Sequence, residues 1–367
     1  MSLRIDSIRF RDFRSYESLA LSGLGSLTVF VGPNAIGKSN IIEGIQLLTS
    51  STSFRHATIE QMIRQGAHES KLEMHVEDGN RSLDVGVLLS EKSKKHTING
   101  KAKRSAELKG LVPSVTFTPD DLELVKGSMS VRRNALDALG SQLNANYYTI
   151  KKDYEKVLKH KNTLLKEEAS PLLLASIDEM LITCGAQLTC YRSALFARLS
   201  EHLKQNYEDI AGGRDVFEST YVPSWIEGLP IGETTDIKRD EAREAIERKL
   251  FELKGEELAR KRCLVGPHVD SVGFFIDGMN ATQFASQGQQ RSVVLAYKLA
   301  EAAVVEEMLG QKPVLLLDDV MSELDTSRRE ALVSYASTDV QTFVTTANLA
   351  YFDKGMLARA DVVSLPL

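Results

Sequence analysis

The chain has 367 residues, of which 43% are hydrophobic and 26% charged, as is usual for a soluble protein of two domains or of one domain with a large insertion. Its net charge of −5 means that bulk charge does not predict a nucleic-acid partner, so any DNA site must be a local basic surface. No apolar run approaches the roughly 20 residues that span a bilayer, and the N-terminus lacks a signal-peptide core, so we expect a cytoplasmic protein without membrane association.

The first hundred residues predict a series of strands. Residues 3–10 alternate apolar and polar side chains, a second strand follows the turn at residues 13–16, and residues 27–31 form an apolar, β-branched third strand. Further strands are predicted at residues 72–76 and 82–89. Residues 96–101 predict a hairpin closed by Asn99-Gly100, a pair that favours the positive φ angles of a type I′ turn.

The third strand leads into Gly32-Pro33-Asn34-Ala35-Ile36-Gly37-Lys38-Ser39, and Asn40 then opens a helical pattern. This is a P-loop between a strand and a helix. The glycines let backbone N–H groups surround a polyphosphate, at which the helix directs its positive end. Lys38 can reach the outer phosphates and the Ser39 hydroxyl can bind Mg²⁺. Residues 32–40 therefore predict a site for ATP or a related nucleotide.

The middle of the chain predicts a helical arm. From Asn134, apolar residues recur at spacings of three and four as far as Leu164, which predicts one long helix. Ser170-Pro171 begins a second helix whose apolar stripe continues to residue 203, so the two should pack antiparallel. A helix of about 35 residues reaches only about 50 Å, which excludes a long coiled-coil rod.

Residues 211–235 contain glycines, prolines and Trp225, and they predict an irregular connection. From Asp236, a good N-cap, a charged helix should return the chain to the head, where a strand is predicted at residues 274–276. We therefore expect three segments, namely an N-terminal part of the head at residues 1–125, an inserted arm at 126–257 and a C-terminal part of the head at 258–367.

A second set of motifs lies near the C-terminus. Residues 314–317 are an apolar run typical of a buried parallel strand, and the run ends in Asp318-Asp319. In P-loop proteins an acid at this place holds Mg²⁺, so we assign Asp318 to the metal and Asp319 to orienting or deprotonating the attacking water. Upstream, Ser286-Gln287-Gly288-Gln289 begins a helix; alone it reads as a plain N-cap, but its place before an Asp-Asp strand favours a ligand site.

Residues 286–289 resemble the signature motif of ABC-type ATPases, and residues 322–325, which end in Asp325, resemble their D-loop. With the segments at residues 13–16, 117–122, 125–128 and 264–268, the chain resembles the RecF family of DNA repair proteins over most of its length. The resemblance implies an α/β fold, in which an ABC-type P-loop ATPase head carries an inserted α-helical arm. It also adds Arg14 and Ser15 to the ATP site.

In ABC-type heads the signature acts on the nucleotide of a second subunit. The resemblance therefore implies that Ser286, Gln287, Gly288, Gln289 and Asp325 contact ATP in trans, and that ATP joins two copies in a two-fold dimer. Hydrolysis would then release the subunits, as a slow switch. The chain departs from the family pattern at Pro33, Met129 and Val269, and residues 345–348 (Thr-Thr-Ala-Asn) lack a switch histidine, so we expect weak ATPase activity.

DNA would be held by clusters of basic residues, which a solvated surface explains equally well. One cluster is predicted in the head and one on the arm: Lys92, Lys94, Lys95, Lys101, Lys103 and Arg104, and Lys151, Lys152, Lys156, Lys159 and Lys161. Phosphate contacts are blind to sequence, so we expect binding to duplexes and single-strand/duplex junctions, with stimulation of the ATPase. The family resemblance further implies the mediators RecO and RecR as partners and the loading of RecA at single-stranded gaps.

Three other functions fit parts of the sequence. An SMC-like chromosome ATPase would need heptads sustained over a longer arm. A phage-defence ATPase would need a nuclease domain, for which no length remains. A nucleotide-dependent interaction module without useful catalysis is compatible with the departures from the family pattern, and ATP turnover distinguishes it from the favoured function.

Overall fold

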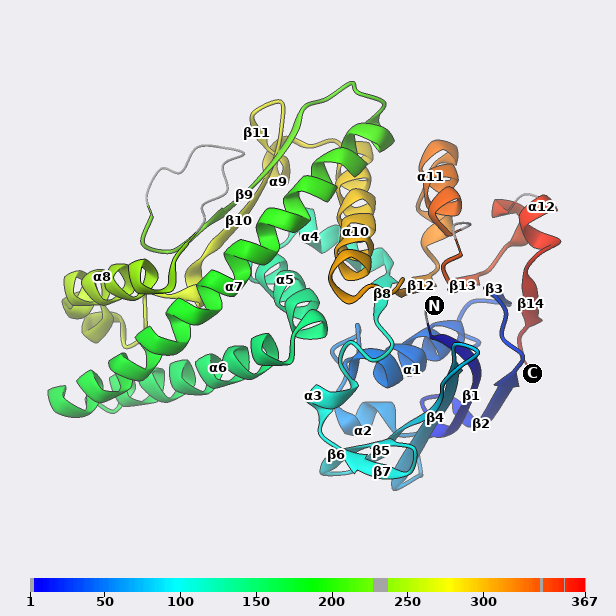
Figure 1. Cartoon of the computed structure of the whole chain (residues 1–367), viewed down its shortest axis with the longest axis horizontal. Helices are drawn as coiled ribbons and strands as arrows, with labels where there is room; N and C mark the ends of the chain where they lie inside the picture. Colours follow the sequence, from blue (N-terminus) through cyan, green and yellow to red (C-terminus); the bar gives the residue numbers. More distant parts are fainter. Residues whose placement is uncertain (1–2, 227–236, 337–338, 353, 367) are drawn as a thin grey trace. The chain divides into compact units, whose positions relative to one another are not determined.

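The computed structural model describes residues 3–226, 237–336, 339–352 and 354–366. The chain forms two compact units (Figure 1). Unit 1 comprises Met1–Asp121 and Glu301–Leu367, and unit 2 comprises Leu122–Ala300. The α/β fold class expected from the sequence is confirmed. The units place residues 258–300 with the arm, whereas the sequence analysis assigned them to the head; the three functional segments remain a prediction.

Unit 1 contains a six-stranded antiparallel sheet in the order β2-β1-β4-β5-β6-β7. Its strands are β1 (Arg4–Phe13), β2 (Tyr16–Ser22), β4 (Glu69–Glu77), β5 (Ser82–Ser90), β6 (Ser93–Ile98) and β7 (Lys101–Lys103). Along β1 and β4, alternate side chains point into the core, which explains the alternation of apolar and polar residues in the sequence. Asn99 and Gly100 have φ angles of 49° and 74°, so the predicted hairpin is confirmed.

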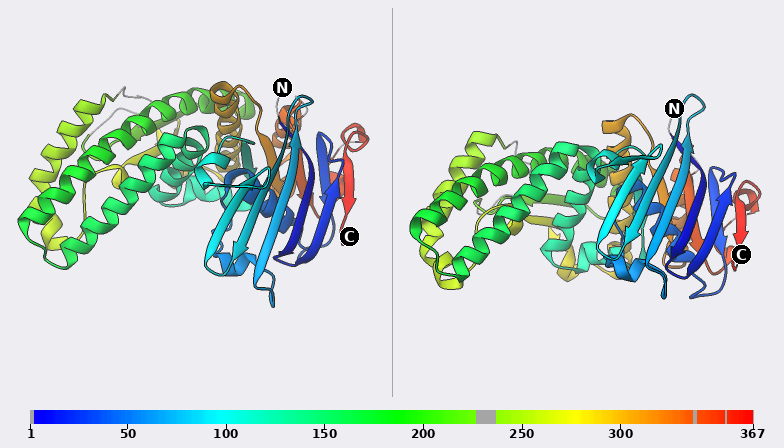
Figure 2. Two further views of the ribbon diagram at one scale, coloured as in Figure 1. Left: turned by 60° about the horizontal axis from the view of Figure 1, so that its bottom comes forward. Right: turned by 90° about the horizontal axis from the view of Figure 1, so that it is seen from below.

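A second, parallel sheet of unit 1 has the order β14-β3-β13-β12-β8. Its strands are β3 (Leu27–Val31), β8 (Ser114–Phe117), β12 (Val314–Asp318), β13 (Thr342–Thr346) and β14 (Asp361–Ser364). The helix α1 (Lys38–Ser50) packs against strands of both sheets (Figure 2). Its buried isoleucines and leucines join the two sheets in one core. Because all five strands are parallel, their carboxyl ends share one edge.

Short helices complete unit 1. They are α2 (Ile59–Met62), α3 (Ser105–Leu108), α11 (Thr326–Ala336), α12 (Lys354–Leu357) and the 3₁₀ turns Val320–Ser322 and Leu349–Tyr351. The turn Pro119–Leu122 ends unit 1.

Unit 2 is mainly helical. Its helices are α4 (Glu123–Lys126), α5 (Met129–Leu143), α6 (Ala145–Lys166), α7 (Pro171–Ala211), α8 (Arg239–Arg260) and α9 (Ala281–Phe284), and α10 (Gln287–Leu309) begins in it. Both α6 and α8 lie along α7 (Figures 1 and 2). A small sheet in the order β11-β10-β9 consists of β9 (Phe217–Val222), β10 (Ser271–Ile276) and β11 (Met279–Asn280).

The arm differs from the prediction in three places. The long helix is broken at Asn144, whose backbone is extended and whose side chain accepts hydrogen bonds from the N–H groups of Asn146 and Tyr147, at 2.8 and 3.3 Å. The expected irregular connection contains strand β9, which pairs with β10. The helix expected from Asp236 begins at Arg239 after an N-cap at Lys238, and Asp236 itself lies outside the described residues.

Helix α7 begins as predicted, with the Ser170 side chain accepting from the N–H of Leu173 and Pro171 in the first turn. By length and composition it is the one helix in the described part of the chain that could cross a membrane. Its apolar face packs in the core of unit 2, as is usual for a core helix of a soluble protein, so this is weak support for a membrane span.

Candidate nucleotide-binding site

The P-loop joins β3 to α1 at the carboxyl edge of the parallel sheet. Gly37, at the N-cap of α1, has a φ of 106°, and a Cβ there would lie 2.8 Å from Ser15 Oγ, so the position requires glycine. No side chain caps the N-terminus of α1 in the described structure. The Asn40 N–H donates to the Gly37 carbonyl at 2.9 Å, so the N–H groups of Lys38 and Ser39 are the ones in the first turn that can bind an anion. The helix dipole favours negative charge there.

Lys38 lies within the loop that it is expected to serve. It is 6% exposed, and its Nζ donates to the carbonyl oxygens of Gly32 and Pro33 at 2.7 and 2.9 Å. The ammonium group is therefore held over the space that the loop encloses, where phosphate oxygens can replace the carbonyls. Pro33 is exposed and supplies only its carbonyl to this arrangement.

The acids predicted for catalysis lie two strands from the P-loop. Strand β13 separates β3 from β12, and the register pairs Thr346 with Val31 and Thr345 with Asp318. Strands are about 4.8 Å apart, which puts Asp318 roughly 10 Å from the end of the P-loop strand. This spacing leaves room for a metal ion and phosphate oxygens between them.

Asp318 and Asp319 differ in environment. Asp318 is 5% exposed and accepts a hydrogen bond from Thr345 Oγ1. Asp319 is half-buried at a φ of 53°, in the left-handed region. Burial raises the pKa of Asp319; the charge of Lys38 opposes this, and the neighbouring Asp318 and Glu323 add to it.

The predicted ATP residues Arg14 and Ser15 lie beside α1. Arg14 Nε and Nη2 donate to both carboxylate oxygens of Glu43 at 2.8 and 2.7 Å, and its Nη1 donates to the carbonyl of Gln61 at 2.7 Å. The Glu43 side chain is fully buried. Arg14 therefore uses its guanidinium to link α1, through Glu43, to the carbonyl of Gln61. Ser15 Oγ accepts from Asn40 Nδ2 at 2.9 Å and faces the P-loop.

The sequence analysis missed Arg55. Its Nη1 donates to Asn40 Oδ1 at 2.9 Å, its guanidinium lies 5.6 Å from the ring centroid of Phe54, and its side chain is 38% exposed. Arg55 is thus a partly exposed cation that contacts Asn40, the residue that follows the P-loop. The only signal in the sequence is an arginine shortly after the P-loop helix, and that signal is weak without the fold.

The signature segment belongs to unit 2. Ser286 and Gln289 form a reciprocal cap at the start of α10: the Gln289 N–H donates to Ser286 Oγ at 3.2 Å, and Gln289 Oε1 accepts from the Ser286 N–H at 2.9 Å. Gln289 Nε2 also donates to Asp215 at 3.1 Å. Ser286 and Gln287 are exposed, and Gly288 is half-buried. The Ser286 hydroxyl can therefore donate outwards, whereas the Gln289 side chain is committed to the cap.

Asp325, in the D-loop of unit 1, is exposed and caps α11: it accepts from the Arg328 N–H and forms an ion pair with the Arg328 guanidinium.

The structure corrects one of the predicted DNA contacts. Lys161 is 1% exposed and bonds Glu257 and Asp178 at 2.7 and 2.8 Å, so it is a core residue of unit 2 and does not present its charge to solvent. A second predicted contact, Lys94, is half-buried. Its ammonium group donates to the carbonyl of Ser51 at the end of α1, and burial lowers its pKa.

The other basic residues lie nearer the surface. Lys103 and Arg104 pair with Glu107, and Lys151 pairs with Glu155. Lys152 lies over the ring of Tyr148 at 4.8 Å. Within the described residues, the exposed lysines of the two clusters without a pairing of this kind are Lys92, Lys95, Lys101, Lys156 and Lys159.

The Gly-Pro-His segment at residues 266–268 takes part in a buried polar network of unit 2. Arg192 forms two hydrogen bonds with Asp137, each of 2.8 Å, and also donates to the carbonyl of Pro267. His268 Nδ1 bonds Tyr154 Oη at 2.7 Å, and Nε2 bonds the carbonyl of Cys263 at 3.1 Å. Burial is the main cause that lowers the pKa of His268 to about 4. The segment therefore has a structural role within unit 2.

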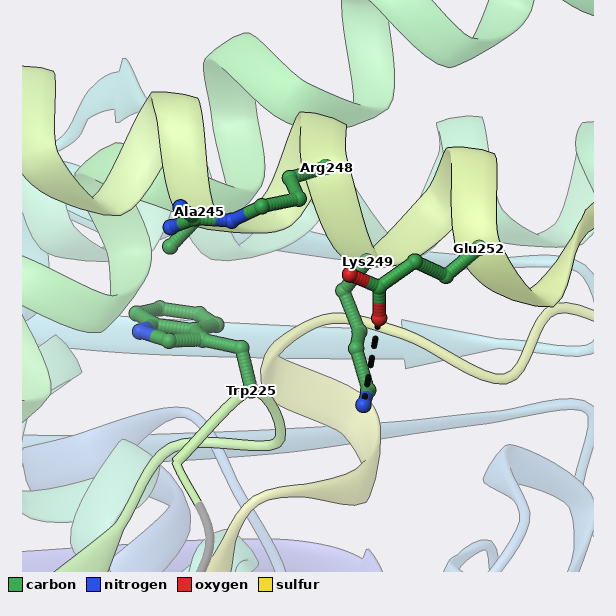
Figure 3. Close-up of a pocket in the computed structure, with 5 residues that line it drawn as sticks. All are labelled: Trp225, Ala245, Arg248, Lys249 and Glu252. Atoms are coloured by element: carbon green, nitrogen blue, oxygen red, sulfur yellow. Dashed lines mark ion pairs between the residues drawn. The ribbon is translucent and has the colours of Figure 1, made fainter.

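A separate pocket of about 320 Å³ lies between α8 and the end of β9 (Figure 3). It is lined by Trp225, Ala245, Arg248, Lys249 and Glu252. Lys249 and Glu252 form an ion pair of 3.4 Å across its side. None of the residues predicted for the nucleotide lines it.

Comparison with known proteins gives consistent matches over nearly the whole chain. The model of the RecF/RecN/SMC N terminal domain matches residues 4–364. The DNA replication and repair protein RecF of Symbiobacterium thermophilum is 36% identical over 348 residues, which cover 94% of this chain and 92% of that protein. RecF of Thermosynechococcus vestitus is 34% identical, with coverage of 98% and 95%.

Comparison with solved structures gives matches of the same kind. The structure of the recombination mediator protein RecF with ATP, in the RecFOR pathway, matches with a TM-score of 0.87 and 28% identity, and covers 96% of this chain and 94% of that one. The Smc head domain of Pyrococcus furiosus matches with a TM-score of 0.53 at 14% identity, which concerns the fold alone.

Proposed function

This chain belongs to the RecF family of DNA replication and repair proteins, and from that premise we propose that it is a cytoplasmic ATPase that binds DNA as an ATP-dependent dimer. The observation that carries the proposal is the arrangement of unit 1. An uncapped helix N-terminus, Lys38, and the Asp318-Asp319 pair all lie at the carboxyl edge of one parallel sheet. This is where α/β sheets bind nucleotides.

In this mechanism the chain holds the phosphates with dipoles and one cation. The N–H groups of Lys38 and Ser39 would donate to the phosphate oxygens, and the Lys38 ammonium would exchange the carbonyls of Gly32 and Pro33 for the outer phosphates. Asp319 has a raised pKa and faces the charge of Lys38, so it is suited to orient a water molecule and accept its proton. Little covalent chemistry is required of the protein, because phosphoryl transfer depends on positioning and charge stabilisation.

The residues present suit a magnesium ion that binds together with the nucleotide. No group of three or more His, Cys, Asp or Glu side chains within the described residues could hold a metal alone. Mg²⁺ is usually held by one or two carboxylates together with substrate phosphates. Asp318 and the Ser39 hydroxyl would supply the protein ligands. When bound, the ion neutralises charge on the transferred phosphoryl group.

The proposed signature contact requires a second copy of the chain. Ser286 precedes α10, a helix of 23 residues, and its exposed hydroxyl accepts from the Gln289 N–H. We expect its O–H to donate to a group outside the cap, where the positive helix end favours a phosphate. Two heads placed in opposite orientation would each complete the other's site, and ATP would join them.

DNA is the proposed macromolecular ligand, with the exposed Lys92, Lys95 and Lys101 of unit 1 as contacts. The test is the salt dependence of duplex binding, since each lost phosphate contact makes the negative slope of log K against log salt shallower by about 0.9. Changing all three lysines to glutamine should therefore flatten the slope, whereas Lys94→Gln should leave it unchanged. Equal slopes for the triple variant and the wild type would remove these residues from the interface. RecO, RecR and the loading of RecA belong to the same proposal on family grounds.

ATP turnover, measured with and without duplex DNA, tests the enzyme. We expect slow hydrolysis that DNA stimulates and that Lys38→Ala abolishes. An interaction module remains the second candidate, because residues 345–348 contain no histidine. Tight ATP binding without turnover under either condition would establish the module and refute the enzyme.

A further inference from the structure

Thr345 occupies the strand between the P-loop strand and the acidic strand. It is fully buried on β13, and the register places it directly beside Asp318. Its hydroxyl donates to Asp318 Oδ1 at 2.7 Å and accepts from the backbone N–H of Asp319 at 2.9 Å. One hydroxyl thus bonds both acids of the proposed site.

The two bonds act on different parts of the acidic pair. The first fixes the rotation of the Asp318 carboxylate and leaves Oδ2 for another ligand. The second is made to a residue with a φ of 53°, a backbone conformation that aspartate adopts only with support from its surroundings. Because β12 ends at Asp318, the Asp319 N–H has no ladder partner, and the Thr345 hydroxyl takes that place.

The other two buried threonine hydroxyls near the ends of β13 behave differently. Thr342 donates to the carbonyl of Val340, and Thr346 bonds the backbone of Asn348. Both therefore serve turns within two residues of themselves, as is usual for threonine. Thr345 instead reaches a carboxylate 27 residues away in sequence.

We propose that Thr345 is a positioning residue for nucleotide hydrolysis. It fixes the Asp318 carboxylate through Oδ1, so that Oδ2 would be available to a magnesium ion, and it fixes the backbone of Asp319, whose side chain would orient the attacking water. The inference rests on the proposed function of unit 1 as an ATPase, and it adds a residue between the P-loop and the acids that links their strands.

The decisive variants are Thr345→Val, which keeps the shape and removes the hydroxyl, and Thr345→Ser, which keeps the hydroxyl. Thr28→Val is the matched control. Thr28 is also fully buried, on the adjacent strand β3, and its Oγ1 has no hydrogen-bond partner in the described part of the chain. The same change at Thr28 therefore alters packing equally and breaks no hydrogen bond.

Two readouts separate positioning from packing. The first is Mn²⁺ affinity, measured by electron paramagnetic resonance on protein saturated with a non-hydrolysable ATP analogue; the second is ATP turnover. A hydrogen bond to a charged group corresponds to roughly a tenfold to hundredfold effect. For Thr345→Val we expect Mn²⁺ affinity at least tenfold weaker and kcat tenfold to hundredfold lower, with metal-free nucleotide affinity within twofold of the wild type. Thr345→Ser and Thr28→Val should resemble the wild type.

Two results would overturn the inference: a Thr345→Val protein that matches Thr28→Val in both readouts, or a Thr345→Ser protein that fails as Thr345→Val does. If valine prevents folding, Thr345→Cys replaces it, because a thiol is close in size and a weak hydrogen-bonding group. A wild type that binds ATP without turnover would refute the proposed enzyme, and Mn²⁺ affinity would then still decide whether Thr345 positions Asp318 for the metal.

Discussion

The pairing of Arg14 with Glu43 leads to a prediction that separates a structural role from nucleotide contact. Glu43 lies on the P-loop helix with a fully buried side chain, and both of its carboxylate oxygens accept from Arg14. The first variant is Arg14→Met, which removes the guanidinium and keeps most of the side-chain length. The second is Glu43→Leu, and the third carries both changes.

The magnitude follows from what remains around Glu43. Removing one member of a buried ion pair costs about 3–5 kcal/mol, because the other charge stays desolvated. The Ser53 hydroxyl at 2.6 Å and Arg55 at 3.8 Å still face the carboxylate, so we expect about 3 kcal/mol for Arg14→Met. The double variant removes both charges and should lose only about 1 kcal/mol, since the carbonyl of Gln61 and the Ser53 hydroxyl lose a partner.

Two assays applied to the same proteins complete the test. The free energy of unfolding is measured with urea and circular dichroism, and nucleotide affinity with a fluorescent ATP analogue. If Arg14 acts only by holding the P-loop helix, the double variant recovers both stability and most of the ATP affinity. A double variant that is stable and still binds ATP poorly would refute this reasoning and support the direct contact that the sequence predicted for Arg14.

Three further predictions concern the P-loop and the core of unit 2. Gly37→Ala should weaken ATP binding at least tenfold, because a Cβ would lie 2.8 Å from Ser15 Oγ at a φ of 106°; an unchanged titration with labelled ATP would contradict this. Arg192→Leu should lower the free energy of unfolding by about 3–5 kcal/mol, since it leaves Asp137 buried with the Tyr147 hydroxyl but without its ion-pair partner. Adding Asp137→Leu should recover part of that loss, because the buried Asp270 still lacks Arg192, and a double variant no more stable in urea than the single one would contradict this. The pKa of His268 is depressed to about 4, so neutral His268 contributes about 3 kcal/mol to the free energy of unfolding above pH 6.5. This contribution is lost as the pH falls towards 4, because protonated Nδ1 can no longer accept a hydrogen bond from Tyr154. His268→Gln should remove that part of the pH dependence of unfolding, and identical pH profiles would refute the assignment.

The elements that carry the proposed nucleotide site were predictable from the sequence because their signals are local. A strand, a glycine-rich loop and a helix follow one another within about twenty residues, and a buried strand ending in two acids is readable from composition alone. The parallel sheet that brings these segments to one edge follows from the same patterns.

Features that depend on distant partners were not predictable in this way. Asn144 breaks the long helix although the apolar spacing continues through it, because its side chain caps the helix that follows. Strand β9 is concealed in a glycine- and proline-containing stretch and is stabilised by pairing with β10. The sequence predicts Lys161 to be a surface cation, yet it is buried and forms ion pairs with two acidic side chains of other helices. The role of Thr345 appears only when the register of β12 and β13 is known.

The central claim is that the signature segment of a second copy completes the ATP site at the P-loop. Sedimentation velocity tests this claim most directly. The wild type should be a monomer without nucleotide and a dimer with ATP and Mg²⁺. Ser286→Arg should bind ATP with wild-type affinity and remain a monomer, because the exposed start of α10 then presents a bulky cation in place of the hydroxyl. A wild type that binds ATP and stays monomeric, or a Ser286→Arg protein that dimerises normally, would contradict the claim.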